Sequence, residues 1–175
     1  MITITLGTIP FPFSRAIDWI FDLLQQNIIT EPVFLQHGIS DISKLGRHPL
    51  VTAMPKTSYQ HLVAMTQQSR LVISHAGQGS TRDLSNRGIQ FVLLPRLAQY
   101  KEHIDDHQLT FAESILPQRD YYCLSREELA AAIQFPPPAL EHPLLMGPDL
   151  SQYLRSVYAP AITRRVVSQT ESCLR

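Results

Sequence analysis

The segment Leu71–Gly88, "LVISHAGQGSTRDLSNRG", changes character in its middle. Apolar residues open it, a histidine and two glycines follow, and a polar run ends at Gly88. This pattern predicts a buried strand, a glycine loop and a helix that stops at glycine. Glycines let the backbone approach a ligand closely, and free N–H groups at a helix N-terminus favour phosphate. Spacing alone fits an ordinary strand–helix turn as well as a diphosphate site.

The same alternation of strands and helices continues on both sides of this segment. Upstream, the patterns predict strands at 1–7, 31–38 and 49–55 and helices at 14–26 and 58–69. Downstream, they predict strands at 90–95 and 120–124, a helix at 103–116, and a helix opened by Ser125 with Glu128 at capping-box spacing. Alternating elements predict an α/β fold, with a parallel sheet covered by helices on both faces.

Length and composition narrow the function classes. The chain of 175 residues fits one domain, and its fifteen basic side chains balance fifteen acidic ones, so no global field recruits nucleic acid or an anionic membrane. Cys123 and Cys173 show no pairing or metal-binding spacing, which predicts reduced thiols in a cytosolic protein. Neither a signal peptide nor a membrane-spanning apolar run is evident. We expect an ordered domain at 1–135 and a proline-rich tail at 136–175 that docks on a surface or is partly disordered.

A second polar stretch, "PRLAQYKEHIDDHQ" at 95–108, directly follows the next predicted strand. Its side chains should gather at the same sheet edge as His75, where Asp106 and Gln108 suit the hydroxyls of a sugar. A metal site is a rival interpretation, because His103 and His107 would lie one helical turn apart, although a third ligand would be needed. A solvated amphipathic helix also remains open.

Three motifs together resemble the C-terminal domain of glycosyltransferase family 28. They are "ITLGTIPFPFSRAI" at 4–17, "ISHAGQGS" at 73–80 and "PRLAQYKEHIDDHQLTFA" at 95–112, and the resemblance covers roughly residues 1–133. It is strongest to the short single-domain members: the cytosolic subunit of the two-part enzyme that adds the second GlcNAc to the dolichol-linked precursor, and its bacterial exopolysaccharide counterparts. In that family the fold is one Rossmann-like half of a GT-B enzyme, the half that binds the UDP-sugar.

The resemblance also implies roles for individual residues. The backbone at Gly7 and Thr8 would face the diphosphate, together with His75, Gly77, Gly79, Ser80 and Thr81. Asp83 would hold the ribose, and the donor sugar would lie against Asp106, His107 and Gln108, with Glu102 and His103 nearby. Chemistry in such a site requires stabilisation of the departing UDP, which Arg96, Lys101, His75 and the helix N-terminus can supply, and no general base is assigned. Lys101 stands where the bacterial pattern usually has glycine.

The function that follows is a UDP-sugar-dependent glycosyltransferase subunit. It would transfer a hexose, N-acetylhexosamine or uronic acid to a lipid-linked acceptor, with inversion and without a tightly bound metal or other cofactor. A sugar-nucleotide epimerase and a non-catalytic UDP-sugar-binding subunit are the alternatives. We expect a cytoplasmic chain held at the membrane by a partner subunit that supplies the acceptor half. That partner would contact the region of Thr8 and Phe11–Phe13, unless these aromatics pack within the domain.

Overall fold

The computed structural model describes residues 1–116 and 119–144 and contains one parallel sheet in that range. Its five strands run in the order β3-β2-β1-β4-β5. The strands are β1 (Ile2–Thr5), β2 (Val33–Gln36), β3 (Val51–Met54), β4 (Leu71–His75) and β5 (Phe91–Leu94). All neighbouring pairs are parallel, which confirms the predicted Rossmann-like α/β fold.

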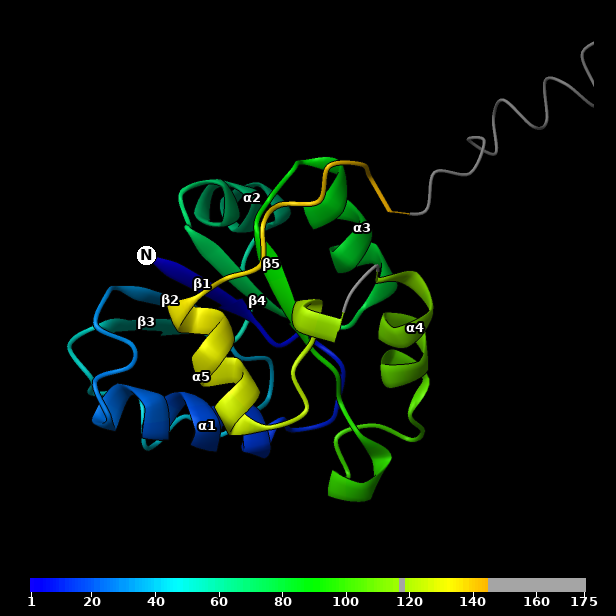
Figure 1. Ribbon diagram of the computed structural model, residues 1–175. Helices are drawn as coiled ribbons and strands as arrows, with labels where there is room; N and C mark the ends of the chain where they lie inside the picture. Colours follow the sequence, from blue (N-terminus) through cyan, green and yellow to red (C-terminus); the bar gives the residue numbers. More distant parts are fainter. Residues whose placement is uncertain (117–118, 145–175) are drawn as a thin grey trace, which may run out of the picture. The chain divides into compact units, whose positions relative to one another are not determined.

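Helices cover both faces of the sheet (Figure 1). They are α1 (Ser14–Gln25), α2 (Tyr59–Gln67), α3 (Gln78–Asn86), α4 (His107–Ile115) and α5 (Arg126–Gln134), with 3-10 turns at η1 (Ala98–Tyr100) and η2 (Arg119–Tyr121). The helices α1 and α5 lie on one face, and α2 and α3 lie on the other (Figure 1). None of the helices within residues 1–116 and 119–144 is both long and apolar enough to cross a membrane.

Strand alternation explains this two-sided core. Ile2 and Ile4 of β1 and Ile73 of β4 join the buried residues of α1 and α5 in one cluster. Val72 and Phe91 point to the opposite face, where they pack with residues of α3 and α4. Because both faces are covered, β1, β2, β4 and β5 are buried almost throughout.

Two predicted elements differ from the structure. The strand expected at 120–124 is instead the turn η2 followed by a single parallel bridge between Leu93 and Tyr122. The helix expected from residue 103 begins only at His107. Asp106 precedes it in a non-helical conformation and uses its carboxylate on the N–H of Ala98, so residues 103–106 form a loop. By contrast, the Ser125–Glu128 capping box is present as predicted.

The chain continues past α5 in an extended segment, residues 136–144, that lies on the face of α3. Gln90 donates to the carbonyl oxygen of Pro137 at 2.7 Å, and the Ser85 hydroxyl accepts from the N–H of Leu144 at 2.6 Å. Leu140 and Leu144 pack against the cluster that contains Leu84 and Phe91. The compact unit therefore extends to Leu144; the rest of the predicted tail lies outside the described residues.

Candidate functional site: the carboxyl edge of the sheet

The strand order places the site. β1 lies between β2 and β4, so the connection from β1 leaves toward one side of the sheet and the connection from β4 toward the other. In open parallel sheets, ligands bind in the crevice that opens at such a switch point. The loops after β1 and β4, which begin at Leu6 and Ala76, meet there.

His75 ends β4, and its ring lies between two glycines. Its Nδ1 is 3.3 Å from the carbonyl oxygen of Thr5. A Cβ atom on Gly7 would come within 2.9 Å of His75 Nε2, and one on Gly77 within 2.5 Å. Both positions therefore exclude any larger residue while the ring stays in place, and Gly7 also has a positive φ of 79°.

The hydrogen bond to Thr5 fixes the state of the His75 ring. A carbonyl oxygen only accepts, so Nδ1 carries the proton and Nε2 presents a lone pair in the neutral ring. Burial lowers the pKa of His75 to about 4, with the nearby Arg96 cation acting in the same direction. The free ring is therefore neutral at physiological pH.

The N-terminus of α3 opens beside this histidine. The N–H groups in the first turn of a helix have no acceptor within the helix. In α3 the N-cap residue is Gly77, which has no side chain to accept from them. A Cβ atom on Gly79 would meet nothing within 4 Å, so this position faces open space. Thr8 is exposed nearby, whereas Ser80 is half-buried. Thr81 differs from the expectation that it faces the diphosphate. It is fully buried, and its hydroxyl donates to the carbonyl oxygen of Gly77.

A cavity of about 330 Å³ lies between α2 and α3 and reaches this helix N-terminus. Its wall includes Gly79, Ser80 and Asp83 from α3 and the apolar side chains of Leu62 and Val63 from α2. Asp83 accepts hydrogen bonds from the Tyr59 hydroxyl at 2.9 Å and from Arg87 Nε at 3.0 Å. The carboxylate is about one third exposed and stands at a hollow that is otherwise mostly apolar.

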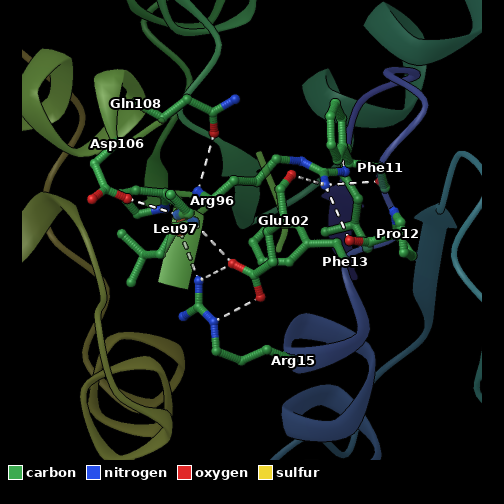
Figure 2. Close-up of polar contacts among 12 residues, drawn as sticks. Phe11, Pro12, Phe13, Arg15, Arg96, Leu97, Glu102, Asp106 and Gln108 are labelled. Atoms are coloured by element: carbon green, nitrogen blue, oxygen red, sulfur yellow. Dashed lines mark hydrogen bonds and ion pairs between the residues drawn. The ribbon is translucent and has the colours of Figure 1, made fainter. Parts of the chain in front are cut away.

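Arg96 corrects the expectation that it contacts the ligand. Its side chain is 1% exposed. The guanidinium donates to the carbonyl oxygens of Leu6 at 2.7 Å, Phe11 at 2.9 Å and Glu102 at 3.0 Å (Figure 2). Burial lowers the pKa of Arg96 to about 10, so it remains a cation at neutral pH. These hydrogen bonds join the loop after β1 to the loop after β5. Because the guanidinium is buried and bonded to protein carbonyl oxygens, we do not assign it a contact with phosphate.

Glu102 is likewise a structural residue rather than a sugar ligand. It is 2% exposed and makes a two-pronged ion pair with Arg15, at 2.9 and 2.8 Å. It also accepts the N–H of Leu97 at 3.0 Å (Figure 2). Beside this pair, a shallower hollow of about 480 Å³ runs past Trp19 and Tyr100.

The predicted sugar-contacting residues lie around the start of α4. His107 and Asp106 are exposed, and Asp106 accepts the N–H of Ala98 at 2.7 Å. Gln108 is buried, and its side-chain oxygen accepts the N–H of Arg96 at 3.1 Å. Its amide nitrogen points away from this network (Figure 2). The last side chain of the set, His103, is mostly buried against Phe11, with ring centroids 5.7 Å apart.

The aromatics of the β1 loop correct the expected partner contact. Phe13 is fully buried in the core and lies under the Arg96 guanidinium at 4.5 Å. Phe11 is half-buried in its stack with His103. Both aromatics pack within the domain, and the exposed residues of that proposed contact are Thr8 and Pro12.

Sequence reasoning missed three residues that shape this edge. Arg15 lies in the motif at 4–17, but its role cannot be read from the sequence because its partner Glu102 lies 87 positions away. The only sequence signal at Tyr59 is an aromatic residue at the start of a predicted helix, and Asp105 fits equally well as an ordinary acidic residue near a helix N-terminus. In the structure Asp105 lies between His103 and His107.

Comparison with known proteins agrees with this architecture. The sequence model of the glycosyltransferase family 28 C-terminal domain matches residues 1–135. No curated protein matches the chain. Because the family match spans most of the sequence and the structure has the Rossmann-like sheet expected of it, the chain belongs to glycosyltransferase family 28 through its C-terminal domain, and the protein is a glycosyltransferase.

Proposed function

We propose that this chain is the donor-binding subunit of a UDP-sugar-dependent enzyme that transfers a sugar to a lipid-linked acceptor. The donor sugar is a hexose, N-acetylhexosamine or uronic acid. One observation carries the proposal: the uncapped N-terminus of α3 faces open space at Gly79, between His75 and the cavity that contains Asp83.

The diphosphate is assigned to this helix N-terminus. Unpaired N–H groups and the helix dipole favour an anion there, and the glycines at positions 7, 77 and 79 keep side chains out of its way. The Nε2 lone pair of neutral His75 would repel a phosphate oxygen. Diphosphate binding beside His75 therefore requires protonation of Nε2, and the negative charge of the ligand raises the pKa of the ring toward that state.

The nucleoside is assigned to the cavity between α2 and α3. Its apolar wall suits the faces of a base, and the Asp83 carboxylate suits ribose hydroxyls, because it can accept from both. Hydrogen bonds from Tyr59 and Arg87 already hold this carboxylate in place in the ligand-free protein.

The sugar is assigned to the start of α4, where the amide nitrogen of Gln108 and the exposed His107 remain available. Transfer then depends on stabilising UDP as it leaves, which the N–H groups of α3 and protonated His75 supply. We propose inversion at the anomeric carbon and leave the general base to the acceptor-binding half.

That acceptor-binding half is assigned to a membrane-associated partner subunit, which also holds the chain at the cytoplasmic side of the membrane. Three exposed apolar side chains in loops at the carboxyl edge support this assignment: Ile39 is 57% exposed, Tyr100 54% and Ile104 75%. They replace Phe11 and Phe13 as the proposed contact with the partner.

A substitution at Gly79 tests the donor site. Gly79→Leu adds bulk where the structure has open space, so the fold should keep its melting temperature while calorimetry shows UDP affinity reduced at least about tenfold, or 1.4 kcal/mol. Gly46→Ala, where the added Cβ would make only an ordinary contact at 3.5 Å, is the control and should bind UDP normally. Undiminished UDP binding by the Gly79 variant would contradict the site.

Transfer itself is tested with UDP-sugar, lipid acceptor and membranes that contain or lack the candidate partner. We expect product only when the chain and partner-containing membranes are combined. Full transfer by the chain alone would refute the requirement for a partner. Epimer formation without acceptor would favour the epimerase, and absence of UDP binding would favour a non-catalytic subunit.

A further inference from the structure

A cluster of metal-binding side chains lies in the loop that leads into α4. His103, Asp105 and His107 each offer one ligand atom, and these atoms all lie within 4.8 Å of one another. The loop, and not a helical turn, brings them together, because α4 begins only at His107. Asp105 supplies the third ligand that the two histidines lack in a purely helical arrangement.

The cluster is held in place by its surroundings. The ring of His103 stacks on Phe11 and meets the ring of His107 edge-on, with centroids 4.4 Å apart. Asp105 accepts from the backbone N–H of His107 at 3.2 Å, and the same oxygen contacts the Nδ1 atom of that residue. The three side chains are therefore partly preorganised.

One atom of the cluster lacks a satisfactory partner. His103 Nδ1 is buried and makes no hydrogen bond among the described residues. It lies 3.3 Å from Asp105 Oδ1, close enough for electrostatic attraction but outside hydrogen-bond geometry. Burial of an unpaired polar atom is unfavourable, and a bound ion between these two atoms would remove that cost.

The donor set indicates the kind of ion. Two imidazole nitrogens and one carboxylate oxygen are ligands that Zn²⁺ prefers, whereas Mg²⁺ and Ca²⁺ prefer oxygen alone. Zn–N distances of about 2.0–2.1 Å in a tetrahedron place ligand atoms about 3.3 Å apart. Reaching this spacing requires a rearrangement of the loop in which the widest pair of ligand atoms draws together and the close His107–Asp105 contact opens.

We propose that His103, Asp105 and His107 form a binding site for a divalent transition-metal ion, Zn²⁺ in the first instance, with water in the remaining position. This site goes beyond the transfer proposed above, with which it shares only His107, and it differs from the expectation that no metal is tightly bound. Bound metal would tie the loop to the first turn of α4, next to Asp106 and Gln108, which contact the backbone at 96–98.

The test is to titrate the metal-free full chain with Zn²⁺ alone and to measure the binding by calorimetry. We expect one ion per chain, a rise in melting temperature on binding, and visible absorption of tetrahedral type when Co²⁺ replaces Zn²⁺. Asp105→Asn and His107→Ala, both at exposed positions, should each weaken Zn²⁺ binding at least tenfold and abolish the rise in melting temperature. His142→Ala, an exposed histidine outside the cluster, is the matched control and should bind as the unsubstituted chain does.

Two outcomes would overturn the proposal. One is an unsubstituted chain that binds Zn²⁺ no more tightly than the Asp105 and His107 variants. The other is tight binding that survives both substitutions, which would place the ion elsewhere. Because UDP binding is measured separately with the Gly79 variant, failure of the metal site and failure of the donor site remain distinguishable.

Discussion

His75 packs within the protein and also lies beside the proposed diphosphate site. Its ring fills the space that Gly7 and Gly77 leave, and its Nδ1 proton is committed to Thr5. Burial of the ring disfavours its imidazolium form and lowers its pKa to about 4. This preference has a consequence for stability that can be measured without any ligand.

The free energy of unfolding should fall in mild acid because of His75. Its folded pKa of about 4 lies below the ordinary value of 6.5, so as the pH falls below 6.5 the unfolded chain takes up a proton that the folded chain does not. The free energy of unfolding should therefore fall by roughly 3 kcal/mol between about pH 6.5 and 4. Above pH 6.5 the contribution of His75 to stability is fully present.

Urea unfolding across that pH range measures the effect. His75→Asn can keep the hydrogen bond to Thr5 but cannot titrate, so its stability should be nearly flat from pH 6.5 to 4.5. The window ends there because carboxylates with lowered pKa, such as those of Glu31 and Glu128, lose their stabilising contacts only at lower pH. Equal slopes for the two proteins would show that His75 is not the titrating group.

Lys101 adopts a left-handed conformation, with φ of 58° and ψ of 29°. A non-glycine residue there is strained by about 1–3 kcal/mol, and glycine relieves this while adding some entropy to the unfolded chain. Lys101→Gly should therefore raise the free energy of unfolding by about 0.5–1 kcal/mol. Lys56→Gly, at an exposed position without positive φ, should be neutral or destabilising in the same denaturation assay. Destabilisation of both variants to the same extent would contradict the assigned strain.

The loops after β1 and β5 are joined by one buried cation. Arg96 holds carbonyl oxygens of both, and Glu102, itself paired with Arg15, closes the second loop onto the N–H of Leu97. The strands alone would leave these loops without mutual support. Their shared geometry at the site is thus a property of the network rather than of either loop.

Loss of the Arg96 guanidinium should be strongly destabilising. Arg96→Met keeps the aliphatic part of the side chain but removes the donors for several buried carbonyl oxygens, at an expected cost of about 3–5 kcal/mol. Arg126→Met removes surface ion pairs with Asp22 and Glu127 and should be much less destabilising than Arg96→Met, because exposed ion pairs contribute little. Thermal and urea unfolding measure the loss of stability in the two variants. Similar losses would contradict the proposal that Arg96 is the main link between the loops after β1 and β5.

The extended segment 136–144 belongs energetically to the sheet domain. It supplies Leu140 and Leu144 to the apolar cluster on the α3 face and accepts a hydrogen bond from the Tyr121 hydroxyl at Pro138, 3.0 Å long. A domain boundary at residue 135 therefore divides a packed unit.

Truncation tests that boundary. A chain ended after Leu144 should exceed one ended after Phe135 in free energy of unfolding by about 2 kcal/mol, from partly buried leucines and lost hydrogen bonds. Leu140→Ala in the full chain should show a smaller loss of the same sign. Equal stability of the two truncated chains would place the boundary at 135 after all.

The amino-acid sequence by itself determined the alternating elements, the parallel sheet and the glycine loop of Leu71–Gly88. These depend on periodicity, β-branched runs and glycine, which act over a few residues. It also indicated that polar side chains of two loops would share one sheet edge, because parallel strands end together. The strand predicted at 120–124 was wrong because a short apolar run does not show whether it will find a partner strand for more than one bridge.

Only the tertiary structure decided what each polar residue does at that edge. Arg96, Glu102 and Thr81 are buried by contacts with distant or backbone groups, and no local pattern encodes such contacts. Whether a charged side chain faces a ligand or satisfies a carbonyl oxygen depends on what the fold brings within about 3 Å of it. For the same reason Asp105 became part of a cluster with His103 and His107 only when the chain formed a loop, and not a helix, before α4.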